Sequence, residues 1–324
     1  MPALYPLTFQ PIFKERVWGG RSLARLYGKS LPTDAPIGES WEISDRPGDA
    51  SVIAHGPLAG KDLHWLVENH RTDLLSDARL EDGRFPLLVK LLDAQQKLSL
   101  QVHPPAAKAA GVRDDAKTEM WFIAEAAPGA ELYVGLKHGV TRAEFERCIR
   151  DGSVAECFHR VSVRAGDAMF LPSGRVHAIG AGLMIFEIQQ NSDTTYRVFD
   201  WNRVGLDGQP RELHVAQSLA SIDFNDFEPA LVDGEETKGN NCRVRKLVSH
   251  PLFNVELLRA QGDGVITLPA TRMQIIGVIA GEVRISGGSA PVLRAGDFCL
   301  LPACLPKVEL TATRNAQFLR TESN

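Results

Sequence analysis

The sequence lacks any long hydrophobic run, and no segment approaches the ~18 apolar residues of a membrane-spanning helix. Its first residues, MPALYPLTFQPIFKERVWGG, place prolines and charges where a secretory signal needs an apolar stretch, so we expect a cytoplasmic protein. A strong excess of one charge is also lacking. The formal net charge of −4 argues against general binding to nucleic acid or to anionic membranes. An anionic ligand would have to be held by cations gathered locally.

Cysteine is scarce as well. The chain has five cysteines, an odd number, and no CxxC pair, so neither a disulfide framework nor a thiolate metal site is indicated. We expect reduced thiols, most of them buried. They are Cys148, Cys157, Cys242, Cys299 and Cys304.

Helical patterns are few, while short β-like runs separated by glycine and proline are many. Such punctuation favours a sandwich or barrel over alternating β-α units. Apolar spacing predicts helices over residues 61–70, 141–150 and 213–222, and Thr141 with Glu144 has the spacing of a capping box. A chain of 324 residues also has room for two domains.

An internal repeat indicates that one fold unit occurs twice. The segment RAGDAMFLPSGRVHAI, beginning at Arg164, is echoed by RAGDFCLLPACLPKVEL, beginning at Arg294. The acidic, glycine-containing stretch between the copies is typical of a connection between domains. We therefore predict an N-terminal domain over 1–222, a linker over 223–241 and a C-terminal domain over 242–324.

The segment KLSLQVHPP alternates in the manner of a β-strand. Leu98, Leu100 and Val102 share one face, and the opposite face carries polar side chains, among them Gln101 and His103. In a barrel wall this polar face could point into a ligand cavity and offer an amide oxygen beside an imidazole. An exposed edge strand explains the alternation equally well.

A second strand-like segment, KTEMWFIAEA, places Lys117, Glu119 and Trp121 on one face and Met120 and Phe122 on the other. Glu119 is a third candidate ligand. It gains weight only from its neighbours, because a single glutamate is usually a solvated surface charge.

The most specific local pattern joins Gly166, Pro172, Gly174 and His177. It resembles the second conserved motif of the cupin superfamily, in which a Pro-x-Gly turn ends one strand and the next strand opens with a metal-binding histidine. The alternative is a structural turn with an unliganded histidine.

Together the candidate ligands form a nitrogen and oxygen set that suits zinc and also manganese, iron or cobalt. Side chains that leave room for water or substrate are typical of a catalytic metal site. The set is Gln101, His103, Glu119 and His177.

The second copy of the motif has lost this chemistry. Cys304 stands in place of Gly174, and Lys307 in place of His177. We therefore expect one metal per chain and a structural or interface role for the second unit. The predicted fold class is all-β, with two cupin (jelly-roll) domains and a few short helices.

Several segments in order resemble the type I mannose-6-phosphate isomerases, in their short bacterial form, over most of the chain. Thr118 departs from the longer relatives, where proline is common, and most of their helical domain is missing. The matching segments are VWGG (17–20), GESWEIS (38–44), PLLVKLLDA (86–94), LSLQVHP (98–104), KTEMW (117–121), LPSGRVHAIG (171–180) and NSDTTYRVFDWNR (191–203).

The resemblance implies interconversion of mannose 6-phosphate and fructose 6-phosphate with one zinc ion on the four ligands named above. It places Ser99 and Lys90 near the substrate phosphate, and Lys117, Asp193 and Arg197 near the reacting carbons. Such isomerisation moves a proton between C1 and C2 through a cis-enediol. The site then needs a polarised carbonyl, a base, and cations facing developing negative charge.

Some roles stay open from the sequence. The base could be Lys117, Asp193, Glu187 or a zinc-bound water. Lys90 lies inside the apolar run LLVKLL, which favours an inward, functional side chain, and Glu187 is a candidate substrate contact.

Three further side chains have a structural alternative. Arg197 could pair with Asp200 instead of substrate, and Trp18 and Trp41 could wall a sugar pocket or simply pack in the core.

Two rival functions remain. A cupin dioxygenase would use iron and two open coordination positions, which four protein ligands disfavour. A sugar-binding cupin without catalysis is the other, although the complete ligand set argues against it. The expected partner is a phosphorylated hexose, with no nucleic acid and no membrane, and the oligomeric state is open.

Overall fold

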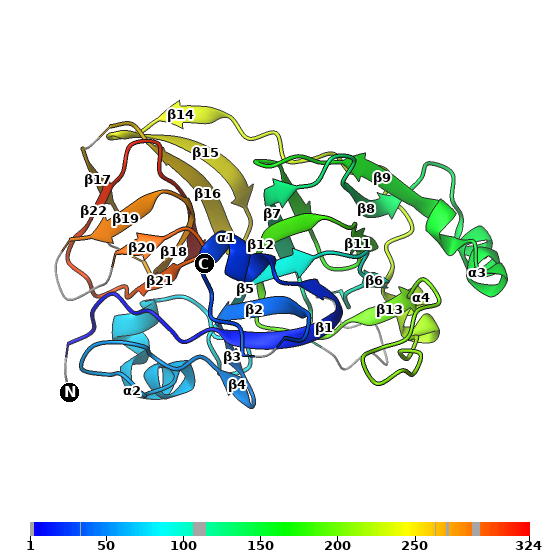
Figure 1. The fold of residues 1–324 in the computed structure, drawn as a ribbon, viewed down its shortest axis with the longest axis horizontal. Coiled ribbons are helices and arrows are strands. Elements are labelled where there is room, and N and C mark those ends of the chain that lie inside the picture. Colours follow the sequence, from blue (N-terminus) through cyan, green and yellow to red (C-terminus); the bar gives the residue numbers. More distant parts are fainter. Residues whose placement is uncertain (1–2, 33, 106–114, 263, 270–271, 287–291) are drawn as a thin grey trace.

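The computed structural model describes residues 3–32, 34–105, 115–262, 264–269, 272–286 and 292–324. The chain is mostly β, and its strands form several antiparallel sheets arranged in two units, seen in Figure 1 with the C-terminal unit on the left. Among the described residues, no helix is both long and apolar enough to cross a membrane.

The N-terminal unit contains a six-stranded and a five-stranded sheet, with a small hairpin beside them. The first sheet has the order β1 (Ile12–Gly20), β2 (Ile37–Ile43), β5 (Leu87–Ala94), β12 (Leu183–Gln190), β7 (Glu119–Ala126) and β10 (Ala168–Leu171). The second has the order β13 (Tyr196–Phe199), β6 (Leu100–Val102), β11 (His177–Ile179), β8 (Glu131–Leu136) and β9 (Phe158–Ser162). The hairpin pairs β3 (Asp45–Arg46) with β4 (Asp49–Ala50).

The C-terminal unit repeats this plan with a six-stranded and a four-stranded sheet. The first has the order β14 (Glu236–Lys238), β15 (Cys242–Ser249), β16 (Phe253–Ala260), β23 (Gln317–Ser323), β18 (Gln274–Ala280) and β21 (Phe298–Leu301). The second has the order β17 (Val265–Leu268), β22 (Val308–Ala312), β19 (Glu282–Ile285) and β20 (Leu293–Arg294).

The sequence repeat corresponds to the same turn in both units. The backbone N–H of Arg164 donates to Asp167 at 2.9 Å, and that of Arg294 donates to Asp297 at 2.8 Å. Each turn leads directly into the edge strand of a six-stranded sheet, β10 or β21. The repeat therefore marks equivalent positions in the two six-stranded sheets.

Helices are short and lie around the sheets. The three predicted helices are present as α2 (Leu63–Leu75), α3 (Arg142–Asp151) and α4 (Val215–Ser221), whereas α1 (Ser22–Tyr27) and the 3₁₀ turn η1 (Val154–Cys157) were not predicted.

Two of these helices show how local sequence sets helix ends. Thr141 caps α3 by accepting a hydrogen bond from the backbone N–H of Glu144 at 3.2 Å, as the capping spacing predicts. Helix α2 passes its predicted end at His70, where the backbone kinks (φ −136°, ψ 28°), and continues to Leu75.

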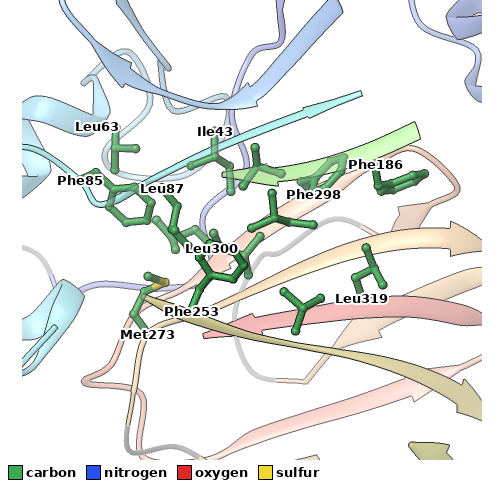
Figure 2. Packing of buried hydrophobic residues seen from close by; sticks show 14 of the residues in the cluster. Ile43, Leu63, Phe85, Leu87, Phe186, Phe253, Met273, Phe298, Leu300 and Leu319 are labelled. Carbon is green, nitrogen blue, oxygen red and sulfur yellow. The ribbon is translucent and has the colours of Figure 1, made fainter. Parts of the chain in front are cut away.

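The largest apolar cluster joins the two units. The alternation of β7 sends Met120 and Phe122 into this cluster and Trp121 into the interior of the N-terminal unit. Burying each large apolar side chain contributes roughly 1.5–3 kcal/mol, so the contact between units is a substantial core. Figure 2 shows its members, among them Ile43, Leu87, Phe186, Phe253, Leu300 and Leu319.

Other contacts also cross between the units. Leu7 near the N-terminus forms an antiparallel bridge with Leu300 of β21, and Arg245 of β15 donates to the carbonyl oxygens of Gly166 and Val232. The connecting segment thus lies against both units. All five cysteines are free, and only Cys304 is exposed, as expected.

Candidate metal and substrate site

One row of side chains crosses the five-stranded sheet at the mouth of the N-terminal unit. Gln101 lies directly opposite His177 on one neighbouring strand and Arg197 on the other. Directly opposite residues share a face, with Cβ atoms about 5 Å apart. The Pro-x-Gly turn fixes the position of His177 at the start of β11. Gly174 in this turn has φ +92°, and its N–H donates to the His103 carbonyl at 3.0 Å.

His103, Glu119 and His177 form a buried cluster whose ligand atoms all lie within 4.8 Å of one another. Nε2 of His177 is 3.3 Å from Oε1 of Glu119, and Nε2 of His103 is 3.5 Å from Oε2. The side-chain amide of Gln101 lies 3.2 Å from Nε2 of His177. The structure therefore brings all four predicted ligands together from β6, its C-terminal extension, β7 and β11.

Hydrogen bonds to the backbone orient both imidazoles. Nδ1 of His103 faces the carbonyl oxygen of Thr194 at 2.8 Å, and Nδ1 of His177 faces that of Arg175 at 2.9 Å. A protonated Nδ1 donates to each carbonyl, which leaves the Nε2 lone pairs directed at the cluster. Burial and the nearby Lys117 ammonium lower the pKa of His103 to about 3, and burial lowers the pKa of His177. Both rings are thus neutral at pH 7.

Glu119 shows that these residues suit a divalent metal. Both carboxylate oxygens are buried and, within the described part of the chain, accept no hydrogen bond, although Nζ of Lys117 lies 3.0 Å from Oε2. Burial opposes ionisation, but Lys117 and His103 hold the pKa of Glu119 well below its ordinary value. A buried, ionised carboxylate with free lone pairs beside two neutral imidazoles is a suitable donor set for a metal ion.

A second row of side chains crosses the six-stranded sheet, and both rows contribute residues to one cavity. Lys90 lies opposite Trp41 and Glu187, and Glu187 lies opposite Trp121. Nζ of Lys90 is 3.2 Å from Oε2 of Glu187 and 5.1 Å from the ring centroid of Trp41. The indole N–H of Trp121 donates to Oε1 of Glu187 at 2.9 Å, while burial raises the pKa of Glu187.

Lys90 is surrounded by carboxylates. Besides Glu187, it has Oε2 of Glu39 at 3.8 Å and Oδ1 of Asp193 at 3.9 Å. Burial lowers the pKa of Lys90, but these carboxylates outweigh that effect and raise it. Lys90 therefore stays protonated and offsets part of the negative charge of these carboxylates. Its position in an apolar strand does not by itself reveal this role.

Glu39 is a site residue that the ligand motifs did not identify. Its carboxylate accepts from the indole N–H of Trp41 at 2.7 Å and from Nε of Arg16 at 2.6 Å. Burial opposes ionisation, but Lys90 and Arg16 lower the pKa of Glu39 to about 2. The feature that points to Glu39 is its place two residues before Trp41, on the same strand face, within the fully buried segment IGESWEI.

The two rows enclose a cavity of about 600 Å³, a size that suits a phosphorylated monosaccharide. Trp41 is not among the lining residues. Side chains that line the cavity without having been predicted include Arg16, Glu39, Trp121 and Arg211. Predicted residues that line it are Trp18, Lys90, Ser99, Gln101, Lys117, Glu187, Asp193 and Arg197.

Arg197 does not form the alternative ion pair with Asp200. Asp200 is held instead by Arg203 at 2.7 Å and by Arg211 at 2.6 Å. Arg197 donates from Nη1 to the carbonyl oxygen of Glu212 at 2.8 Å, and its buried Nε has no hydrogen-bond partner in the part of the chain that the structure describes. Among the described residues, no carboxylate lies within ion-pair distance of Arg197, so its charge is available to the cavity.

The low pKa of Glu39 predicts loss of stability in acid. Its folded-state pKa of about 2 lies below the ordinary value of 4.5, so its contribution is present above pH 4.5 and is lost as the pH falls toward 2. The difference corresponds to roughly 3 kcal/mol. We expect Glu39→Gln to be less stable at pH 7 and to lose less free energy of unfolding between pH 4.5 and 2 than the wild type. Urea unfolding across this range measures both effects.

The exposed Glu125, whose side chain is half accessible, supplies the control. Glu125→Gln should keep the wild-type slope of stability against pH. An identical acid slope in the wild type and Glu39→Gln would contradict the assignment.

Comparison with known proteins agrees with this geometry. The family model for the catalytic domain of type I phosphomannose isomerase matches residues 7–125. Mannose-6-phosphate isomerase ManA of Bacillus subtilis (strain 168) is 37% identical over 94% of this chain and 95% of its own, and the mannose-6-phosphate isomerase of Streptococcus mutans is 36% identical over 92% of each. A crystal structure of the mannose 6-phosphate isomerase from Bacillus subtilis matches with a TM-score of 0.89 and 30% identity, covering 98% of this chain and 99% of that one. The chain therefore belongs to the type I phosphomannose isomerase family.

Proposed function

We propose that the chain interconverts mannose 6-phosphate and fructose 6-phosphate in the 600 Å³ cavity of its N-terminal unit. The observation that carries this proposal is the buried cluster of His103, Glu119 and His177. Gln101 and Lys117, which line the cavity, contact this cluster. The names of the related enzymes, which match nearly the whole chain, support the same substrate pair.

The ligands of the proposed zinc ion are Gln101, His103, Glu119 and His177. Two neutral imidazoles, one carboxylate and one amide oxygen suit zinc, whose bound form polarises a carbonyl oxygen as a Lewis acid. The backbone carbonyls that fix both Nδ1 atoms keep the ligand atoms in place before binding. Such preorganisation lowers the cost of assembling the site.

We assign the remaining steps to residues of the cavity wall. Lys117 and Arg197 face the oxygens on which negative charge develops in a cis-enediol pathway, and stabilise that charge. A carboxylate moves the proton between C1 and C2. Glu187 and Asp193 both line the cavity, and the raised pKa of Glu187, due to burial, favours it as the group that holds the proton.

Ser99 and Lys90 are proposed substrate contacts. The hydroxyl of Ser99 lies 3.4 Å from the amide oxygen of Gln101, so it can donate to a substrate oxygen close to the ligand row. Lys90 supports binding mainly by neutralising Glu187 and Glu39, and only its residual charge is available to a phosphate group. Trp18, which is 3% exposed, forms an apolar part of the wall.

We further propose that the two units are cupin domains, 1–222 and 242–324, joined through 223–241, and that only the first binds metal. Their six-stranded sheets have equivalent strand orders, and the four-stranded sheet of the second unit matches the five-stranded sheet of the first without β13. Glu119 lies opposite Leu171 in β10, and Gln274 lies opposite Leu301 in β21, so Gln274 occupies the register position of Glu119. Lys307, at the repeat position of His177, is exposed and paired to Glu309 at 2.6 Å, so neither of these two equivalent positions carries the ligand type found in the first unit.

The decisive experiment is a coupled assay for fructose 6-phosphate on metal-free protein, with zinc, manganese, cobalt or iron added back. We expect activity to return with one equivalent of metal per chain, as measured by elemental analysis. Formation of no fructose 6-phosphate with any of these metals would overturn the proposal. Oxygen uptake with iron would indicate a dioxygenase instead.

A further inference from the structure

A row of cations crosses three strands of the C-terminal unit, far from the ligand cluster in sequence. Lys238 of β14 lies directly opposite Arg243 of β15, which lies directly opposite Arg259 of β16. Directly opposite side chains share one face of the sheet with Cβ atoms about 5 Å apart, and like charges in such positions are destabilising. An arrangement of this kind calls for a compensating negative charge.

The described residues supply little of that charge. Glu236 is the one carboxylate paired with the row, at 3.3 Å from Nη1 of Arg243 and 3.9 Å from Nη1 of Arg259. Lys238, and Arg314 in the loop between β22 and β23, have no carboxylate within ion-pair distance in the described ranges. Nε of Arg259 is buried and has no hydrogen-bond partner there. Among the described residues, these four cations therefore have one carboxylate partner, Glu236, in a chain whose formal net charge is −4.

Three of these cations, Arg243, Arg259 and Arg314, line a concavity of about 710 Å³ together with Glu236. This volume is large enough for a small metabolite. Its lining contains guanidinium and amide groups and no aromatic side chain, so it offers donors for an anion and no surface on which a nucleobase could stack. The lining residues are Glu236, Arg243, Arg259, Ala260, Gln261, Gly262, Arg314, Asn315 and Gln317.

We propose that this concavity, the β14–β16 site, binds a small anion carrying phosphate groups, of the size of a sugar phosphate or bisphosphate. Arg243, Arg259 and Arg314 hold the phosphate oxygens through charged hydrogen bonds, and guanidinium groups suit bidentate recognition of phosphate. Binding removes the like-charge repulsion across the sheet. The site is separate from the catalytic cavity, with which it shares no lining residue, and it lies on the strands at the upper left of Figure 1.

The test uses metal-loaded protein and inorganic phosphate as the probe, with chloride adjusted to keep the ionic strength constant. In the wild type, isothermal titration calorimetry should resolve phosphate binding that is lost in the double variant Arg243→Gln, Arg259→Gln. We expect the apparent dissociation constant for this binding to rise tenfold or more, the scale of about 1.5 kcal/mol for one lost charged hydrogen bond. Any phosphate binding in the catalytic cavity persists in the variant, and kcat and KM for isomerisation stay at wild-type values.

Thermal unfolding gives an independent readout. Without phosphate and at low salt, the double variant should unfold at the same temperature as the wild type or a higher one, because the repulsion among the three directly opposite cations is removed. Phosphate should raise the wild-type Tm more than that of the variant.

Arg284 of β19 is exposed and outside the concavity, so Arg284→Gln should respond to phosphate as the wild type does. An equal phosphate response in the wild type and the double variant would overturn the proposal. A lower Tm for the double variant in the absence of phosphate would overturn it as well, since the cations would then stabilise the sheet without a ligand.

Discussion

Replacing His177 with alanine is expected to remove most of the bound metal and to lower kcat/KM by roughly 10³ or more, a loss of several kcal/mol of electrostatic stabilisation. His177 supplies one of two neutral imidazoles, and its Nε2 is 3.3 Å from the carboxylate of Glu119. The Nδ1 contact with the Arg175 carbonyl shows that the backbone is arranged to hold this ring. Elemental analysis of the purified variant and the coupled isomerase assay measure the two effects.

The second unit provides a matched control for this substitution. Lys307 occupies the repeat position of His177, is exposed, and pairs only with Glu309 among the described residues. Lys307→Ala should therefore retain the wild-type metal content and kcat/KM. Full metal retention in His177→Ala, or metal loss in Lys307→Ala, would show that the assignment of one metal site to the N-terminal unit is wrong.

Local sequence patterns predicted the parts of this site that local geometry determines. The alternation of residues 97–103 placed Gln101 and His103 on one face, and both meet the same cluster. The Pro-x-Gly spacing predicts the position of His177 at the start of its strand, because a turn of fixed geometry precedes that strand. Capping residues likewise gave the start of α3 at Thr141.

Features that depend on which strands pair with one another could not be predicted from local sequence patterns. Glu39 and Arg16 enter the cavity because β1 and β2 extend the sheet beside β5, and no motif in either segment states that neighbour relation. Asp200 pairs with Arg203 and Arg211, and Arg203 is as close to it in sequence as Arg197 is, so sequence distance does not show which arginine faces Asp200. The cation row of Lys238, Arg243 and Arg259 also appears only once the register is known.

Arg197 is the residue of the cavity wall whose substitution best tests the proposed catalysis. Its strand position lies opposite Gln101, one of the proposed metal ligands, on a strand distant in sequence, and it lines the cavity proposed to bind substrate. Burial and the neighbouring Arg211 lower the pKa of Arg197, so its charge is poorly compensated before substrate arrives. A carbonyl contact with Glu212 fixes the side chain without neutralising it.

We expect Arg197→Ala to lower kcat by roughly 10² or more, because the lost donor stabilises charge that exists mainly in the transition state. Metal content should stay at the wild-type level, since Arg197 holds no ligand position. Arg197→Lys keeps the charge with fewer donors and should recover part of kcat, whereas a purely structural role would not depend on charge. Steady-state kinetics with mannose 6-phosphate separate these cases. A normal kcat with only a raised KM in Arg197→Ala would make Arg197 a substrate-binding residue, because its interaction would then be equally strong in the ground state and the transition state.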